Sequence, residues 1–227
     1  MSKSAIILFA NLPEFEARAK SFSGFTALKA TQKLSGILTK HFYNLAKKTT
    51  AQVFLIDTYQ QKGKTFGERI SNAFADVYAE SFDHVVCIGN DCPALTLNQL
   101  ENAINQTEKG KVVLGPTSDG GAYLIGIPKS YFNSATFSKV SWQSSKTYLD
   151  LKAIFANVND SLVETDLLND IDGEKDIRNY SNQNPLIKLL LQTLKSFKTA
   201  FNTVLYCMKA DILFISSLSL KGPPLFG

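Results

Sequence analysis

The chain has 227 residues, of which 44% are hydrophobic and 19% are charged, and its formal net charge is +4 at pH 7. This is the composition of an ordinary soluble globular protein, and the length suits one sizeable core. The charge is mild, and no block of Lys and Arg is interleaved with aromatic residues, so no nucleic-acid partner is expected. The three cysteines lack metal-ligand spacing, which favours free thiols in a reducing cytoplasm.

Short apolar runs alternate with stretches of helical periodicity from residue 5 to about residue 180. The first run is too short for a signal peptide or a membrane span. The alternation predicts a three-layer α/β/α sandwich with a mostly parallel central sheet. The expected strands cover residues 5–10, 52–57, 85–88, 111–114, 122–127 and 161–165, and the expected helices cover 26–48, 66–79, 97–107 and 145–155, with another from 173.

The predicted sheet lacks the motifs of several common α/β enzymes. No G-x-G-x-x-G segment follows a predicted strand, which argues against a simple Rossmann dehydrogenase. The chain also has no P-loop and no nucleophile-elbow serine. Any site must therefore come from other loops at the ends of the strands.

One such loop is Gly89-Asn90-Asp91-Cys92-Pro93, directly after the apolar run His84–Ile88. An unbroken apolar run is typical of a strand that is buried on both faces in a parallel sheet. Asp91 would then stand at the carboxyl end of a central strand, where open α/β sheets bind their ligands. Thr96 is expected to cap the helix that follows. The alternative is that Asp91 only caps a turn.

A second loop of the same kind contains Asp119, Gly120 and Gly121 and lies between the runs 112–114 and 122–127. Paired glycines allow a close approach of the backbone to a ligand and allow positive φ values. Two strand-end loops that each place an acid beside glycine indicate one site built from both.

The two segments GNDCPALT and VVLGPTSDGGAYLIG resemble a bacterial family provisionally described as nucleotide-diphospho-sugar transferases, also described as glycosyltransferases of arsenosugar biosynthesis. Gln61–Arg69 resembles the family's Q-x-G-x-L-G-E-R segment, and Asp170–Ile177 resembles its D-[IV]-D-T-x-E-D-L segment. Trp142, with Ser144 and Ser145 after it, lies where the family has W-S-[ST]. The resemblance covers roughly residues 5–180. It implies a glycosyltransferase-A-like fold and metal-dependent transfer of a sugar from an activated nucleotide to an unknown acceptor.

The resemblance also implies the roles of particular residues. Asp91 and Asp172 would bind Mg²⁺ or Mn²⁺, hard cations that prefer oxygen ligands. Asp119 would be the catalytic residue, either as a third partner of the metal or as the base that orients the acceptor. The substrate-binding residues would be Arg18, Lys20, Gln61, Arg69, Asn90, Gly120, Gly121 and Trp142.

The loop after the first strand departs from the family pattern. In the related nucleotidyltransferases it is glycine-rich and ends in Arg and Lys residues that hold the triphosphate, but here no glycine lies between Ala10 and Ser23. Arg18 and Lys20 also fit a simpler interpretation as solvated charges, and Trp142 fits one as a packing residue. Two alternatives stay open: a nucleotidyltransferase that uses a nucleoside triphosphate, and a catalytically silent member that binds nucleotide or protein.

Residues 185–227 lie beyond these motifs and predict a helical extension to a domain formed by residues 1–184. The extension must bury its apolar stripe on the domain, on a second copy of the chain in a homodimer, or at a membrane surface. An apolar run at 212–215 is interrupted nearby by Lys209 and Asp211, so it is not expected to span a membrane. The apolar stripe that the extension must bury consists of Leu186, Leu189, Leu190, Leu194 and Phe197.

Overall fold

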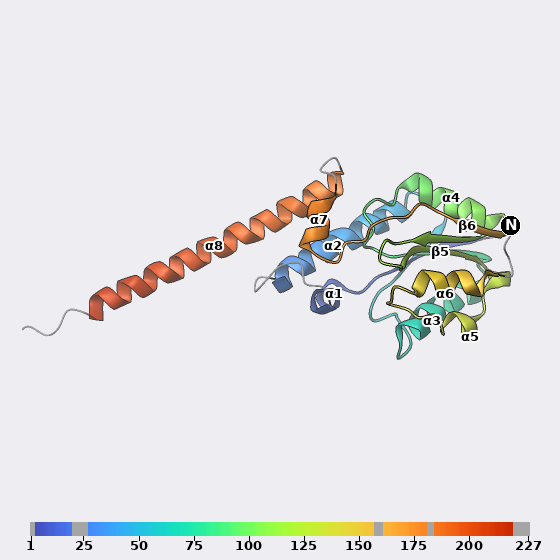
Figure 1. The fold of residues 1–227 in the computed structure, drawn as a ribbon, viewed down its shortest axis with the longest axis horizontal. Helices are drawn as coiled ribbons and strands as arrows, with labels where there is room; N and C mark the ends of the chain where they lie inside the picture. Colours follow the sequence, from blue (N-terminus) through green and yellow to red (C-terminus); the bar gives the residue numbers. More distant parts are fainter. Residues whose placement is uncertain (1–2, 20–26, 157–160, 181–183, 220–227) are drawn as a thin grey trace, which may run out of the picture.

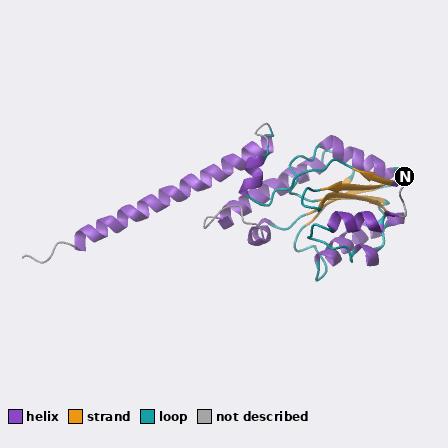
Figure 2. Ribbon diagram, viewed as in Figure 1, coloured by secondary structure: helices purple, strands orange, loops and turns teal. Residues whose placement is uncertain are grey.

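The structure is a computed structural model that describes residues 3–19, 27–156, 161–180 and 184–219. A six-stranded sheet in the order β2-β1-β3-β5-β4-β6 lies between two layers of helices (Figures 1 and 2). This confirms the predicted α/β sandwich. The strands are β1 (Ser4–Phe9), β2 (Gln52–Ile56), β3 (His84–Ile88), β4 (Val112–Pro116), β5 (Ala122–Pro128) and β6 (Leu162–Glu164).

The helices follow the predicted segments closely, and α3 has the expected bounds. An additional short helix, α1, comes directly after β1, and another, α5, lies between β5 and α6. Thr96 caps α4 as predicted, in a capping box with Gln99. The helices are α1 (Pro13–Ala19), α2 (Ala27–Ala46), α3 (Phe66–Ala79), α4 (Leu97–Glu108), α5 (Ser134–Phe137), α6 (Thr147–Ile154), α7 (Glu174–Asn179) and α8 (Pro185–Ser219), with a 3₁₀ turn η1 (Lys129–Tyr131).

Alternate residues of β1 face the two helical layers, as the period of a strand requires. Ile6 and Leu8 belong to the core shared with α2, α4 and the start of α8. Ile7 and Phe9 belong to the core shared with α3, α5 and α6. The central strands are therefore buried on both faces, which explains their almost unbroken apolar sequences.

One strand runs against the other five. β1 pairs with β2 and β3 in parallel, and β4 pairs with β6 in parallel, whereas β5 is antiparallel to both β3 and β4. Residues 117–121 join β4 to β5, and so short a link permits a hairpin but no parallel crossover. The carboxyl ends of β1, β3 and β4 therefore share one edge of the sheet with the start of β5.

Helix α8 begins on the body of the protein and then continues away from it (Figure 1). Its first turns bury Leu186, Ile187, Leu190 and Leu194 in the core that contains α2. Leu189 was expected in this buried stripe, but its side chain is 46% exposed, and Ile187 takes the buried position. The helix runs without a break to Ser219.

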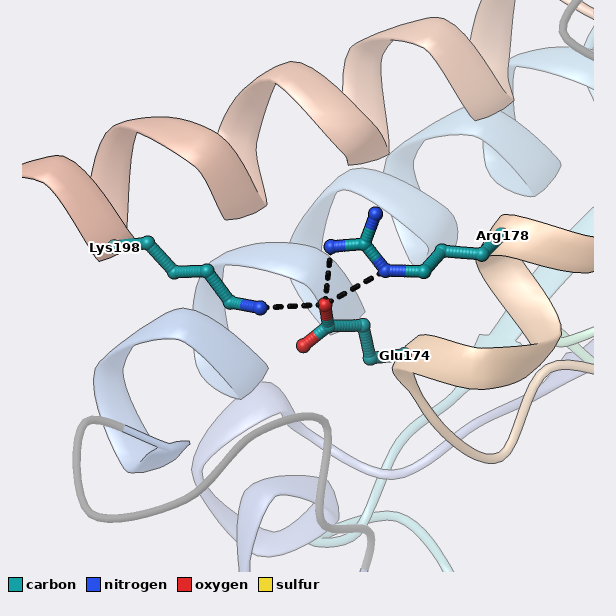
Figure 3. Close-up of polar contacts among 3 residues, drawn as sticks. All are labelled: Glu174, Arg178 and Lys198. Carbon is teal, nitrogen blue, oxygen red and sulfur yellow. Dashed lines mark hydrogen bonds and ion pairs between the residues drawn. The ribbon is translucent and has the colours of Figure 1, made fainter.

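An ion-pair cluster joins α8 to α7, as Figure 3 shows. Lys198 Nζ lies 2.6 Å from Glu174 Oε1, and Arg178 Nε donates to the same oxygen at 2.8 Å. These contacts lower the pKa of Glu174, with the Lys198 hydrogen bond as the largest cause. Since α7 directly follows Asp172, this cluster connects the extension to the acidic segment of the expected site.

Within the described residues, none of the helices combines the length and the apolar character that crossing a membrane requires.

Candidate functional site

A cavity of about 370 Å³ opens at the sheet edge where β1, β3 and β4 end. Six segments contribute to its wall: the end of β1 with α1, the loop after β2 with the start of α3, the loop after β3, the β4–β5 loop, the loop that contains Trp142, and the acidic segment before α7. Their polar side chains include Asn11, Glu16, Gln61, Asn90, Asp91, Thr117, Asp119, Gln143, Ser144, Asp170 and Asp172.

Asp91 is held by contacts of its main chain and by its position over Gly89. Its carbonyl oxygen accepts a hydrogen bond from Ile171 N at 2.8 Å, which joins the loop after β3 to the acidic segment. A Cβ at Gly89 would lie 3.1 Å from Asp91 Oδ1, so the glycine makes room for the carboxylate to fold back. Asn90 Nδ2 donates to Thr39 Oγ1 on α2 at 2.9 Å.

The β4–β5 loop fixes Asp119 within a tight turn. Gly121 N donates to Asp119 Oδ1 at 2.9 Å, and the Thr117 hydroxyl donates to the same oxygen. Of the paired glycines, Gly120 has the positive φ, at +90°. Gly121 is needed for space, because a Cβ there would lie 2.7 Å from Thr117 Oγ1. The turn therefore presents the Asp119 carboxylate in one orientation.

The segment that carries Asp170 and Asp172 is tied to both strand-end loops. Leu168 N donates to Pro116 O at 3.1 Å, and Ser118 N donates to Leu168 O at 3.0 Å. Ile171 is fully buried and donates to Asp91, as described above. The backbone thus brings the acids of this segment to those of the other two loops, an arrangement that the family resemblance implied.

The four aspartates form an acidic cluster in which the charges of three act on the fourth. Burial is the largest cause, and together with the charges of Asp119, Asp172 and Asp91 it raises the pKa of Asp170 to about 6. No three Asp, Glu, His or Cys side chains among the described residues are arranged to hold a metal ion by themselves. Mg²⁺ needs only one or two protein carboxylates when phosphate oxygens and water complete its shell. The cluster therefore fits a cation that arrives with a phosphorylated ligand.

The raised pKa gives a pH prediction for the protein in a chelator. Ionising Asp170 costs folding free energy, so stability falls between the ordinary aspartate pKa near 4 and the folded value of about 6. Asp170→Asn removes this cost. We expect the free energy of unfolding of the variant to be higher than that of the wild type by about 1 kcal/mol at pH 7.5, after allowance for solvent screening. At pH 4 the two proteins should be equally stable.

Asp150→Asn is the matched control for this experiment. Hydrogen bonds from Ser141 lower the pKa of Asp150, so its contribution is present at neutral pH and lost in acid. This variant should lose stability at pH 7.5. Denaturant unfolding of both variants at both pH values makes the comparison. If Asp170→Asn raised the free energy of unfolding equally at both pH values, the gain would not come from the charge of Asp170, and this would contradict the raised pKa.

Trp142 closes one side of the cavity with an orientation that is fixed by packing. Its Nε1 donates to Phe137 O at 3.0 Å, and its ring lies 5.5 Å from the Phe66 ring between centroids. A Cβ at Gly67 would lie 2.7 Å from Trp142 Cδ1, so α3 approaches this ring closely. The residue therefore packs its loop and also lines the cavity.

The remaining predicted site residues fall into different places. Gln61 lines the cavity and donates through Nε2 to Ala10 O and Ile56 O, at 3.3 and 3.4 Å. Arg69 lies outside the cavity wall, where Nη1 donates to Lys64 O at 3.4 Å. Gly120 also lies outside the wall, but it contacts the segment that follows Trp142. Lys20 and the side chain of Arg18 lie outside the described residues.

Gly120 supports the wall because the Trp142 loop rests on it. Tyr148 N donates to Gly120 O at 2.9 Å, and a Cβ at Gly120 would overlap the main-chain oxygen of Ser145. We expect Gly120→Ala to destabilise the protein by several kcal/mol, since strain and overlap combine. Gly110→Ala is the control, because Gly110 also has a positive φ, +78°, but has open space around it. Urea unfolding should show that Gly110→Ala lowers the free energy of unfolding by about 1 kcal/mol. Equal losses for the two variants would contradict the packing role of Gly120.

Glu16 and Asn11 were not expected in the site. Helix α1 brings Glu16 to the cavity wall with its side chain almost buried, and Asn11 Nδ2 donates to Glu16 Oε2 at 3.0 Å. The local signal was present in the sequence, since Pro13 followed by Glu14 and Glu16 is a typical helix start. A carboxylate therefore lines the cavity in the segment for which the family resemblance implied basic residues.

The comparisons with known proteins agree with this architecture. A family model described as "Uncharacterized protein conserved in bacteria (DUF2064)" matches residues 33–144. No curated protein matches the chain. A crystal structure from Desulfovibrio desulfuricans G20, provisionally named a nucleotide-diphospho-sugar transferase, aligns with a TM-score of 0.71 and 19% identity, covering 87% of this chain and 97% of that chain. At this identity the match shows the fold, and it confirms the glycosyltransferase-A-like fold that the motifs implied.

Two more distant structures align at TM-scores too low to support an argument. CMP:2-keto-3-deoxy-manno-octonic acid synthetase, complexed with CTP, aligns with a TM-score of 0.43 and 9% identity over 84% of this chain and 99% of that one. Rv0371c of Mycobacterium tuberculosis H37Rv, complexed with manganese, aligns with a TM-score of 0.37 and 12% identity over 78% of this chain and 96% of that one.

Proposed function

Because residues 33–144 match the DUF2064 family and the chain has the nucleotide-diphospho-sugar transferase fold, we propose that it is a metal-dependent glycosyltransferase. In this proposal it transfers a sugar from a nucleotide-activated donor to an acceptor that we leave unnamed. The observation that carries the proposal is the group of four aspartates from three loops that line one cavity at the carboxyl edge of the sheet. Open α/β sheets bind their ligands at this edge.

A diphosphate group would be repelled by this acidic cavity unless a cation came with it. We assign Asp91 as the first ligand of that cation and Asp172 as the second, because the hydrogen bond from Ile171 to Asp91 holds their two segments together. A bound Mg²⁺ or Mn²⁺ would neutralise the diphosphate and stabilise the charge on the leaving nucleotide. Asn90, Gln61 and Trp142 would contact other parts of the donor.

Asp119 is assigned to the acceptor. Its Oδ1 is fixed by Thr117 and Gly121, so the carboxylate is held in place before the acceptor arrives. In the transfer, the acceptor oxygen forms a bond to the anomeric carbon while the bond from that carbon to the phosphate oxygen breaks. The acceptor proton passes to Asp119, and the nucleoside diphosphate leaves with the electron pair.

Helix α1 favours glycosyl transfer over nucleotidyl transfer. A triphosphate needs cationic side chains or a run of free backbone N–H groups. Here the segment after β1 is helical, and its described part presents Glu16 to the cavity. A carboxylate at this position disfavours a long polyphosphate.

Product analysis tests the reaction class. The protein is incubated with nucleotide sugars, candidate acceptors and Mn²⁺, and the released nucleotide is identified by chromatography. We expect a nucleoside diphosphate from a nucleotide-diphospho-sugar. Release of pyrophosphate from a nucleoside triphosphate would instead identify a nucleotidyltransferase. Absence of turnover with retained nucleotide binding would favour the catalytically silent alternative.

A further inference from the structure

The two helices α2 and α8 form a surface whose charge differs from that of the rest of the chain. Residues 27–48 contain five lysines and no acid, and residues 185–227 contain five lysines and one acid, Asp211. Since the whole chain has a formal net charge of only +4, the remainder is net negative. Such an asymmetry suits contact with an anionic partner.

Between these helices lies a groove of about 680 Å³. Its α2 side carries Lys33 and Lys40, both exposed, on either side of Ile37. Its α8 side carries Leu186 and Leu189, the second of which is 46% exposed. We name these residues the α2–α8 groove. Lysines beside exposed apolar side chains are the combination that binds the boundary between lipid headgroups and acyl chains.

The sequence of α8 extends this apolar character beyond the body of the protein. The buried residues Ile187, Leu190 and Leu194 recur at three- and four-residue spacings. The same spacing continues in the sequence past the last turn that packs on the body, in a helix of 35 residues that is about 50 Å long. A helix draws most of its stability from packing an apolar stripe, so this part requires a surface to lie on. The continuing stripe consists of Phe197, Phe201, Val204, Leu205, Met208, Ile212 and Ile215.

We propose that the α2–α8 groove and the projecting part of α8 dock on an anionic phospholipid surface, with α8 lying in the plane of the interface. Lipid is favoured over a second copy of the chain because the surface is cationic, and two copies would bring like charges together. A helix that lies on the membrane also agrees with the absence of a spanning helix among the described residues.

This docking would bring the candidate site near the membrane. Figure 1 shows α1, α7 and the start of α8 at the opposite end of the body from the N-terminus, where β1 begins. The carboxyl ends of the parallel strands, and hence the cavity, lie toward this end. A membrane-associated acceptor could therefore reach the cavity, but the docking proposal does not depend on the transfer reaction.

The test is co-sedimentation of the full chain with lipid vesicles. We expect binding to vesicles of phosphatidylcholine with 30% phosphatidylglycerol on the order of tenfold or more tighter than to pure phosphatidylcholine, and weaker in 0.5 M salt. Lys33→Glu with Lys40→Glu should lower binding at least tenfold. The control, Lys64→Glu with Lys109→Glu, makes the same change of charge at exposed positions elsewhere and should bind as the wild type does.

Leu189→Ser tests the apolar part of the groove and should weaken binding to the anionic vesicles without removing its salt dependence. Circular dichroism melting checks that each variant is folded, which is expected because the changed side chains are exposed. Equal binding of the two double variants would overturn the proposal, as would failure of the wild type to bind anionic vesicles. A dimer in light scattering that persists in 0.5 M salt, together with no vesicle binding, would assign the surface to a second copy.

Discussion

Truncation of the chain after Asn184 is expected to leave a protein that aggregates or melts far below the wild type. The cut removes Leu186, Ile187, Leu190 and Leu194, all buried in the core shared with α2. Each such side chain contributes roughly 1.5–3 kcal/mol, and a domain has only about 5–15 kcal/mol in total. Thermal melting and size-exclusion chromatography of the truncated chain measure the effect.

A truncation after Ala200 provides the control. It keeps the buried turns of α8 and the ion pair between Lys198 and Glu174 while removing the projecting part. We expect this chain to melt within a few degrees of the wild type. A chain ending at Asn184 that stays monomeric with an unchanged melting temperature would show that α8 contributes nothing to the core.

Asp91→Asn is expected to abolish metal-dependent nucleotide binding while leaving the fold intact. The amide loses the charge that a hard cation requires. It also relieves repulsion within the acidic cluster, since Asp91 is one of the charges that raise the pKa of Asp170. Affinity for a nucleotide sugar with Mn²⁺ should fall by more than the roughly 10- to 100-fold that is typical of residues supporting a metal ligand.

Asp57→Asn is the matched control for this change. Asp57 also follows a strand, β2, but its Oδ1 accepts from Tyr59 N at 2.9 Å within a turn outside the cavity wall. We expect normal binding and a small loss of stability. Isothermal titration and denaturant unfolding separate the two roles. If Asp91→Asn behaved as Asp57→Asn does, Asp91 would be a turn residue.

Much of the fold follows from local sequence signals. The apolar runs predicted the positions of the strands, because buried central strands need apolar side chains on both faces. Thr96 marked the start of α4 through its capping box. The direction of β5 was not predicted because an apolar run does not encode it, although the short link of residues 117–121 already required a hairpin.

The site was predicted less completely than the fold. The two strand-end loops placed Asp91 and Asp119 in one site, since strand ends on one edge of a sheet lie near each other, whereas only the family resemblance implied that the Asp170–Asp172 segment joins them. The resemblance did not place Arg69 outside the wall, because the direction of a side chain at a helix start depends on tertiary packing. Glu16 was not predicted either, because the family pattern has a glycine-rich loop at this position, whereas this chain has a helix that starts at Pro13.

The central claim is that the acidic cavity binds a nucleotide sugar together with a divalent cation. The most direct test is a thermal-shift screen of nucleotide sugars with the full chain, in Mn²⁺ and in EDTA. At a hundred times its dissociation constant a ligand adds about 2.7 kcal/mol, which corresponds to roughly 5–10 °C for a chain of this length. We predict such a shift for at least one nucleotide sugar in Mn²⁺ and none for the same compound in EDTA. Equal shifts in both buffers, or no shift with any nucleotide sugar, would contradict the claim.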